Sequence, residues 1–431
     1  MASGRRSGPF VQVLRHLVDT QLMQDQAVSS PAGSTPLDAF CALVLADHAL
    51  QRELLAPDFT DEEKFITRLA DIARQRGFAI AADDVRQAMR PRLPGLEGLL
   101  DANVSETPEP PDGWLPTRVF PHAGALYVHW AYFGARRLRQ PFFESEVYSC
   151  ALQPPNRLFR YVTSIEKLAA WLDRHPHLQP RGFIFHMSRC GSTLVSQMLA
   201  TLPSNLVVSE ASPIDTVVQA SHWWPELDEQ RHAAWLSSIV GAFGQRRGGD
   251  ERRYFVKLDC WHTLALPLFR RAFPAVPWVF LYRDPVEVLA SQVSQPGTQM
   301  LPRGTGPDLY GIERSYGPGT AEDYYARVLA KVCEPVLRDY GQGGGLLVNY
   351  RELPEALFTA ILPHFGVACD ETDRAAMTEA TRYDAKTPSM TFAPDSEAKQ
   401  RGASGATRAA AERWLRDPYS RLEALRAART G

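Results

Sequence analysis

The feature of this 431-residue sequence that most restricts its fold is a series of short apolar segments that begins near residue 181. Helical stretches separate these segments, which read GFIFHM, NLVVS, YFVKL, VPWVFLY and LLVNY. Nearly continuous apolar strands that alternate with helices are typical of a parallel sheet buried on both faces. The sequence therefore predicts an α/β fold, with a parallel sheet flanked by helices as in the three-layer P-loop proteins. Such sheets bind ligands at the carboxyl ends of their strands.

Composition limits the functions that this chain can have. It carries 47 basic and 49 acidic residues, so no overall field favours nucleic acid or an anionic membrane. The six cysteines include no CxxC pair, which argues against a disulfide framework or a zinc knuckle. The N-terminal residues are too polar for a secretion signal, and no apolar run reaches membrane-spanning length. We expect a cytoplasmic protein without nucleic-acid or membrane partners, in which any anion site is local.

Changes in composition divide the chain into five predicted parts. Ser, Pro and Gly predict a loose segment before residue 37, and SETPEPPDG predicts a stiff linker. WLPTRVF and ALYVHWAYF predict a pair of strands, and Thr163 with Glu166 predicts the cap of a helix through 164–174. The parts are a flexible N-terminus (1–36), a small helical domain (37–92), a Pro-rich linker (93–113), a β-containing extension (114–180) and the sheet domain (181–431).

Three helices are predicted in the small N-terminal domain. Apolar residues recur at helical spacing over 37–55, Thr60 and Glu63 match a capping box for a second helix, and a third helix fits 82–90. The segments DAFCALVLADHALQRELL, FITRLADIARQRGFAI and ADDVRQAM resemble the nitrile-hydratase-like leader peptide family. This resemblance implies docking of a peptide or protein through residues 37–92 and a role in natural-product modification. Composition alone favours a helical bundle that only packs against the rest of the chain.

A strand, a tight turn and a helix follow one another in HMSRCGSTLVSQML. In this context, successive backbone N–H groups and the N-terminus of the helix bind an anion. Gly191 lets the turn approach its ligand closely, and Arg189 supplies positive charge. The nucleotide triphosphatase motif GxxxxGK[ST] is not matched, because His186 replaces its first glycine and Ser192 replaces its lysine. The segment therefore predicts an anion loop that does not serve ATP hydrolysis.

A second anion site is predicted in VPWVFLYRDPVEVLASQ. An apolar strand ends at Arg283, Asp284 is a suitable cap for the next helix, and Pro285 fits its first turn. Ser291 lies two turns into that helix, on the side that faces the cap. We therefore expect Arg283 and Ser291 to converge on one phosphate.

The two motifs together resemble those of the P-loop sulfotransferases, over residues of about 180–420. These enzymes use 3'-phosphoadenosine 5'-phosphosulfate (PAPS), hold its 5'-phosphosulfate with a loop like that of Arg189, and hold its 3'-phosphate with an arginine and a serine eight positions later. KQRGASG is similar to the RKGxxG clamp of the family, although Gln400 replaces its first basic residue and the usual DWK sequel is absent. The resemblance implies PAPS as the donor, no metal, and a set of donor-binding residues. That set is Ser188, Arg189, Cys190, Gly191, Ser192, Thr193, Arg283, Ser291, Arg401 and Gly402.

The resemblance also implies a reaction, in which a sulfuryl group passes to a hydroxyl or amine of a small molecule, a glycan or a peptide. Arg189 keeps its proton and would therefore stabilise charge on the departing phosphate. The acceptor needs a base. Glu210 in VVSEASPID is our first choice, with Asp259 and His262 in VKLDCWH as alternatives, and Lys257 matches a lysine of the family.

Two other functions are compatible with the motifs. A kinase-like phosphotransferase of the P-loop type needs a phosphate-binding lysine and a magnesium-holding carboxylate, and neither is evident after the anion loop. A nucleotide-binding protein without catalytic activity is the second alternative. It would be favoured if Glu210 and Asp259 both pointed away from the cleft.

Overall fold

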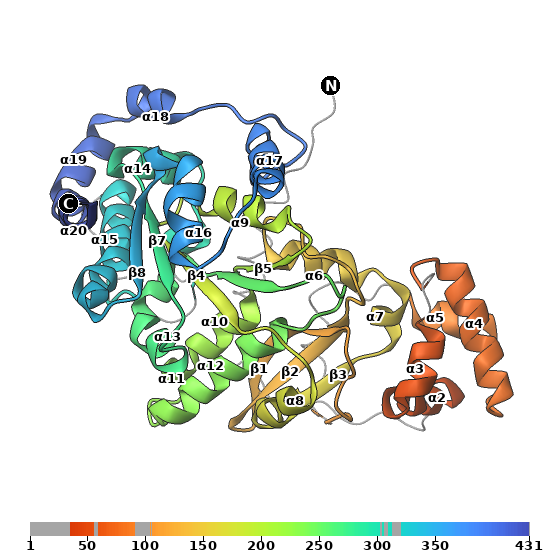
Figure 1. Ribbon diagram of the computed structural model, residues 1–431. Helices are drawn as coiled ribbons and strands as arrows, with labels where there is room; N and C mark the ends of the chain where they lie inside the picture. The colour runs from red at the N-terminus through yellow and green to blue at the C-terminus, as the bar shows by residue number, and fades with distance from the viewer. Residues whose placement is uncertain are drawn as a thin grey trace.

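The computed structural model describes residues 35–55, 59–90, 104, 106–301, 304–305, 309–312 and 320–430. Its centre is a parallel sheet with the strand order β5-β6-β4-β7-β8 (Figure 1). The strands are β4 (Pro180–His186), β5 (Asn205–Ser209), β6 (Arg253–Lys257), β7 (Trp278–Tyr282) and β8 (Gly345–Asn349). Each strand matches one of the apolar segments, so the predicted α/β fold with a helix-flanked parallel sheet is confirmed.

The strand order brings the ends of several strands to one place. β4 pairs with β6 through Ile184 and Lys257, and with β7 through His186 and Leu281. From β4 the chain first crosses to β5 and later returns to β7 on the other side. The carboxyl end of β4 is therefore a topological switch point, where open α/β sheets bind their ligands. The segments that follow β4, β5, β6 and β7 meet at this edge.

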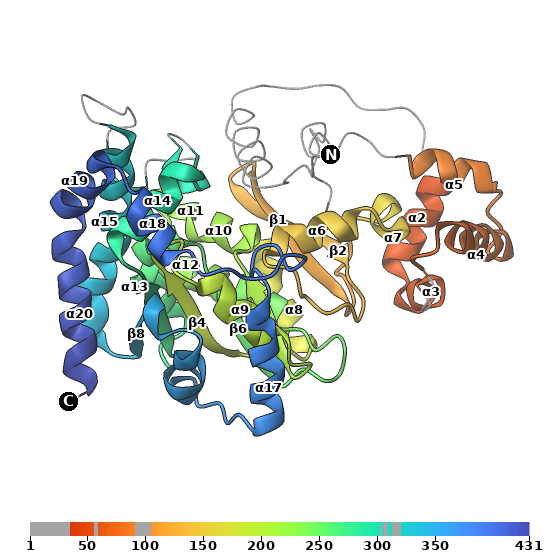
Figure 2. The same ribbon diagram turned by 90° about the horizontal axis from the view of Figure 1, so that it is seen from above.

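Helices cover both faces of the sheet (Figures 1 and 2). α12, α13 and α15 pack together on one face, and α9 and α17 pack together on the other, as right-handed crossovers require. The helical elements are α9 (Ser192–Ala200), α10 (Ser212–Val218), α11 (Ala220–Trp223), α12 (Glu229–Phe243), η3 (Cys260–Ala265), α13 (Leu266–Ala272), α14 (Pro285–Ser294), η4 (Thr298–Met300), α15 (Ala321–Asp339), η5 (Tyr340–Gln342), η6 (Tyr350–Glu352), the π-helical η7 (Leu357–Ile361), α16 (Leu362–His364), α17 (Glu371–Glu379), η8 (Ala380–Arg382), α18 (Ser396–Gly402), α19 (Gly405–Trp414) and α20 (Arg416–Thr430). Within the described ranges, no helix combines the length and the apolar character needed to cross a membrane.

A smaller antiparallel sheet precedes the large one. β1 (Trp114–His122) and β2 (Ala125–Tyr132) form the predicted strand pair, and β3 (Tyr161–Ser164) adds to β2. The prediction that Thr163 caps a helix was wrong, because Thr163 lies in β3 and its hydroxyl accepts a hydrogen bond from the Trp130 indole (2.9 Å). Ser164 caps the helical turn instead. The surrounding helices are α6 (Phe143–Ala151), α7 (Pro154–Leu158), η2 (Ile165–Lys167) and α8 (Leu168–Arg174).

The N-terminal helices are α2 (Pro36–Ala46), α3 (His48–Leu54), α4 (Glu62–Gln75) and α5 (Ala82–Ala88). The helix predicted over 37–55 is divided, because Asp47 ends α2 and caps α3 with its carboxylate. The predicted capping box of Thr60 was wrong by one residue. Asp61 is the cap of α4, and its carboxylate accepts the Lys64 N–H (3.2 Å).

These helices pack against the smaller sheet through buried polar contacts. The Gln51 amide donates to the Tyr161 hydroxyl (2.9 Å) and accepts from the Trp114 indole (2.9 Å). The segment predicted as a linker lies beside the same sheet, where the Trp171 indole donates to the Pro110 carbonyl (2.7 Å). Over residues 106–112 this segment therefore contacts the folded core, and the N-terminal helices share buried hydrogen bonds with β1 and β3.

Candidate functional site

The predicted anion loop lies between β4 and α9. Ser188, Arg189 and Gly191 have positive φ angles of 83°, 51° and 85°. Left-handed backbone is strained for residues other than glycine and occurs mostly where a loop holds a ligand. A run of such residues directly before the N-terminus of a helix is typical of loops whose backbone N–H groups bind an anion. A Cβ on Gly191 would lie 2.7 Å from Leu353 Cδ1 and 2.8 Å from Tyr350 Cδ2, so this position requires glycine.

The side chains of the loop hold it to the scaffold. The Ser188 hydroxyl accepts hydrogen bonds from the side-chain amides of Gln292 and Gln299, each at 2.9 Å. The Cys190 thiol donates to the Leu281 carbonyl (3.1 Å). The Ser188 and Cys190 side chains therefore anchor the loop, and Gln292 connects it to α14.

Arg189 lies half-buried at the tip of the loop, where its guanidinium donates to the Gln295 carbonyl at the end of α14. Burial lowers the pKa of Arg189, and the nearby Glu210 carboxylate opposes that effect. The Ser192 and Thr193 side chains are buried in the first turn of α9. Arg189 thus brings a cation to the N-terminal end of a helix.

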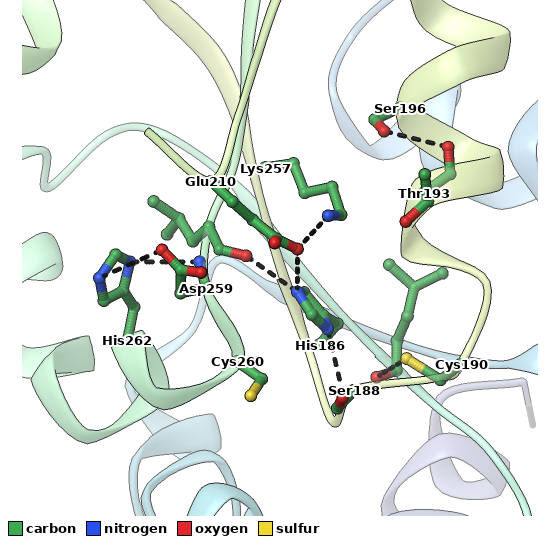
Figure 3. A network of polar contacts seen from close by, with 12 residues as sticks. His186, Ser188, Cys190, Thr193, Ser196, Glu210, Lys257, Asp259, Cys260 and His262 are labelled. Atoms are coloured by element: carbon green, nitrogen blue, oxygen red, sulfur yellow. Dashed lines mark hydrogen bonds and ion pairs between the residues drawn. The ribbon is translucent and has the colours of Figure 1, made fainter. Parts of the chain in front are cut away.

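Glu210, Lys257 and His186 form a buried cluster at the ends of β5, β6 and β4 (Figure 3). Lys257 forms an ion pair with Glu210 Oε1, and His186 Nε2 lies 3.3 Å from the same oxygen. His186 Nδ1 accepts the Ser188 N–H (3.1 Å), so the imidazole proton is on Nε2, which also faces the Leu258 carbonyl (2.9 Å). One imidazole therefore connects the anion loop to the predicted base.

The charges around Glu210 keep it ionised. Burial raises the pKa of Glu210, but the Lys257 ammonium and the hydrogen bonds from His186 and Lys257 outweigh it and hold the pKa well below its usual range. Burial lowers the pKa of His186, which stays neutral near pH 7. The sequence had placed Lys257 and Glu210 at separate strand ends without linking them, and it gave His186 no role.

The two alternative bases lie in a second buried chain of hydrogen bonds. The Asp259 N–H donates to His262 Nδ1 (3.3 Å), and His262 Nε2 donates to Asp215 Oδ1 (2.9 Å). The Trp261 indole also donates to Asp215 (2.6 Å). Burial raises the pKa of Asp259 well above its usual value, with help from the Glu210 and Asp215 carboxylates. Asp215, Asp259 and His262 place oxygen and nitrogen atoms within 4.8 Å of one another, but both nitrogens of His262 already take part in hydrogen bonds.

The predicted second anion site begins where β7 ends. Asp284 caps α14 through the N–H groups of Val286 (3.0 Å) and Glu287 (3.2 Å), as the sequence predicted. Arg283 is buried, and its guanidinium lies over the Tyr350 ring at 3.9 Å from the ring centre. Arg283 therefore has the stacked and desolvated setting in which an arginine binds anions most strongly.

Acidic and hydroxyl groups surround the Arg283 guanidinium. It donates to Glu287 Oε2 (2.6 Å), Asp395 Oδ1 (2.8 Å) and the Ser396 hydroxyl (2.9 Å). Ser291, which we predicted to share a bound phosphate with Arg283, is half-buried further along α14. Asp395 and Ser396 follow Arg283 by more than one hundred residues, so no local pattern in the sequence could have identified them.

The predicted C-terminal clamp lies near Arg283, but Asp395 and Gln400 make its contacts with the β7 end and α14. The Gln400 amide donates to Asp284 Oδ1 (2.9 Å), which fixes α18 against α14. Arg401 is 78% exposed and lies 3.7 Å from Glu397, and Gly402 ends α18. The structure thus brings the tail to Arg283 through Asp395 and Gln400, and it places the Arg401 side chain at the surface.

No protein-family model and no curated protein matches the chain. Among solved structures, it is similar to a sulfotransferase domain from the curacin biosynthetic pathway, with 16% identity and a TM-score of 0.34 over 55% of this chain and 98% of that one. A sulfotransferase from Alicyclobacillus acidocaldarius has 15% identity and a TM-score of 0.33 (58% and 96% covered). The sulfotransferase domain of the Synechococcus PCC 7002 olefin synthase has 18% identity and a TM-score of 0.32 (58% and 96%). Likeness at this level concerns the fold alone, so the function must be inferred from the site.

Proposed function

We propose that the protein is a sulfotransferase that moves a sulfuryl group from PAPS to a hydroxyl or amine of a small molecule, a glycan or a peptide. The observation that carries this proposal is a pair of arginines that follow the carboxyl ends of the neighbouring strands β4 and β7. Arg189 supplies the charge at one site and Arg283 at the other. Gln292 of α14 connects the helix that follows Arg283 to the loop that carries Arg189. Two fixed anion sites suit a ligand with two separate anionic groups.

The residues at both sites fit the two ends of the donor. The backbone N–H groups of residues 189–193 and the Arg189 guanidinium would hold the 5'-phosphosulfate, with Ser188 as a further predicted contact through its side chain. The 3'-phosphate would bind Arg283, where the carboxylate of Asp395 marks the position that an anion occupies. The Asp395 side chain is 46% exposed, so it can move into solvent when a phosphate takes its place at Arg283. Ser291, Arg401 and Gly402 remain predicted donor contacts from the resemblance.

PAPS, when bound, supplies an activated sulfuryl group on a phosphate oxygen. Arg189 and the loop N–H groups would stabilise the charge that grows on that oxygen as its bond to sulfur breaks. A carboxylate takes the proton that the acceptor loses. Glu210 suits this role because its lowered pKa keeps it ionised at neutral pH, whereas burial raises the pKa of Asp259 and disfavours its ionised form. His262 is engaged at both nitrogens, so it positions Asp259 and Asp215.

Lys257 and His186 would assist Glu210 rather than react themselves. Lys257 keeps the Glu210 carboxylate ionised. His186 contacts both Ser188 of the anion loop and Glu210, and it therefore positions the carboxylate relative to the loop. A base with a depressed pKa is weak, so we expect the acceptor to loosen the Lys257 ion pair as it binds.

The resemblance of residues 37–92 to a leader peptide family supports two further proposals. These residues would dock a peptide, and the protein would take part in natural-product modification.

The experiment is a titration of the full chain with 3',5'-adenosine bisphosphate, the product that PAPS leaves. Arg283→Gln should weaken binding by about tenfold or more, because it removes a charged contact to phosphate. Arg416→Gln is the matched control, since Arg416 is 72% exposed on α20 and pairs with Glu412. Equal affinities for the two variants would refute the assignment of the 3'-phosphate site.

A further inference from the structure

One carboxylate of the C-terminal helix α20, that of Glu423, holds the carboxyl ends of β7 and β8. Tyr282 and Asn349 are the last residues of these two strands, and they are buried and paired in the sheet. The Tyr282 hydroxyl donates to Glu423 Oε1 (2.5 Å), and the Asn349 amide donates to the same oxygen (3.0 Å). Because α20 also packs against β8, Glu423 joins two neighbouring strand ends at the edge where the proposed donor sites lie.

The other oxygen of Glu423 accepts hydrogen bonds from two arginines. Arg351 of η6 donates to Glu423 Oε2 (2.5 Å), and Arg426 of α20 donates to it as well (3.1 Å). Burial raises the pKa of Glu423, but the hydrogen bonds from Arg426 and Tyr282 outweigh it and lower the pKa to about 2. The carboxylate is therefore ionised at neutral pH, and it connects β7, the segment that follows β8, and α20.

The same network fixes the η6 turn after β8. The Asn349 side-chain oxygen accepts the Arg351 N–H (3.1 Å), and the Asn349 N–H donates to Glu352 Oε2 (2.8 Å). Arg426 of α20 donates to the other oxygen of Glu352 (2.9 Å). Tyr350 lies in the chain between the residues that make these bonds. Its place in the turn is therefore set by α20 as well as by β8.

Tyr282 and Tyr350 both adjoin Arg283, the arginine proposed to bind the 3'-phosphate. Tyr282 precedes Arg283 in the chain, and the Arg283 guanidinium lies 3.9 Å from the centre of the Tyr350 ring. In the proposed complex a phosphate replaces Asp395, so the direction of the guanidinium then depends more on the Tyr350 ring. An arginine holds a phosphate best through two parallel N–H groups, which requires a fixed direction of its planar fork.

We propose that Glu423 is a positioning residue of the 3'-phosphate site. Through Tyr282 and the η6 turn, it fixes the Arg283 guanidinium for the donor. This inference rests on the proposed function. The sequence analysis had given α20 no role, because the contacts of Glu423 with the ends of β7 and β8 span more than seventy residues.

A purely structural role of Glu423 has a different consequence. If Glu423 only attached α20, its loss would reduce stability and leave the affinity of the folded protein for every nucleotide unchanged. A positioning role instead affects the ligands that carry a 3'-phosphate. Because 3',5'-adenosine bisphosphate and adenosine 5'-phosphate differ in that one group, a comparison of their affinities isolates the Arg283 site.

The test is calorimetry of the full chain with each nucleotide, at a temperature where circular dichroism shows that every variant is folded. Wild type should bind the bisphosphate more tightly than adenosine 5'-phosphate. Glu423→Gln turns an amide donor toward the arginines, so it should weaken bisphosphate binding by about fivefold and leave adenosine 5'-phosphate unaffected. Tyr282→Phe removes one hydroxyl and keeps the ring, and it should have the same effect to a smaller extent. The matched control is Glu412→Gln, at a 63%-exposed glutamate of α19 that pairs with Arg416.

Each outcome decides the proposal. An unchanged preference for the bisphosphate in Glu423→Gln overturns it, and so does an equal loss of affinity for both nucleotides. If Glu423→Gln does not fold, Tyr282→Phe decides by the same comparison. If wild type does not prefer the bisphosphate, the proposed 3'-phosphate site fails and the role of Glu423 fails with it. If Arg283→Gln abolishes the preference while Glu423→Gln and Tyr282→Phe behave like Glu412→Gln, only the role of Glu423 fails.

Discussion

Gly191→Ala is a perturbation whose cost can be worked from the structure. Gly191 has a φ of 85°, and its added Cβ would lie 2.7 Å from Leu353 and 2.8 Å from Tyr350. The left-handed backbone costs alanine about 1–2 kcal/mol. Overpacking adds about 1–3 kcal/mol, because the leucine end can move but the ring is less free. We therefore expect the free energy of unfolding to fall by about 2–5 kcal/mol.

Gly249→Ala separates the two contributions. Gly249 has a φ of 86°, but a Cβ there would meet nothing within 4 Å, so it carries the backbone cost alone. Urea unfolding of both variants should show a larger loss for Gly191→Ala by about 1–3 kcal/mol. Tyr350 also lies under Arg283, so only Gly191→Ala should weaken binding of 3',5'-adenosine bisphosphate. Equal losses of stability, with equal affinity, would refute this reading of the loop.

Three further predictions follow from the same contacts. Arg189→Ala should lower turnover at saturating PAPS more than it weakens donor binding, and steady-state kinetics that show intact turnover would contradict its role. The depressed pKa of Glu210 stabilises the fold above pH of about 4 and loses that contribution as the pH falls through the folded pKa. Glu210→Gln should therefore flatten the decline of the unfolding midpoint between pH 5 and 3, and an unchanged slope would argue against the ion pair with Lys257. Gln51→Leu leaves the buried Trp114 indole without its acceptor and should reduce the free energy of unfolding by about 1–3 kcal/mol, measured in urea.

The strands and the loops that follow β4 and β7 were predictable because each depends on local sequence. A buried parallel strand needs an unbroken apolar run, and the segments NLVVS and YFVKL fit a buried strand better than any other element. The turn at Gly191 and the cap at Asp284 are likewise encoded within a few residues. The positions of Arg189, Glu210, Lys257 and Arg283 at one sheet edge then follow from parallel topology.

The missed residues depend on contacts between distant segments. Asp395 reaches Arg283 across 112 positions, and nothing near Asp395 in sequence reveals that partner. β3 is short and is stabilised by pairing with β2, so its residues alone favoured a helix cap. Similarly, Gln51 is an ordinary polar helix residue in the sequence, and its buried hydrogen bonds to Trp114 and Tyr161 depend on tertiary packing.

The proposed function requires the Arg189 and Arg283 sites to bind a nucleotide with phosphates at both its 3' and 5' positions. Calorimetric titration of the full chain with 3',5'-adenosine bisphosphate in the presence of a chelator tests this most directly, beside a titration with ATP and magnesium. We predict saturable binding of the bisphosphate without metal, and much weaker binding of magnesium-ATP, because Ser192 stands directly after Gly191 where a triphosphate-binding loop has lysine. Equal or tighter binding of magnesium-ATP would contradict the proposed function.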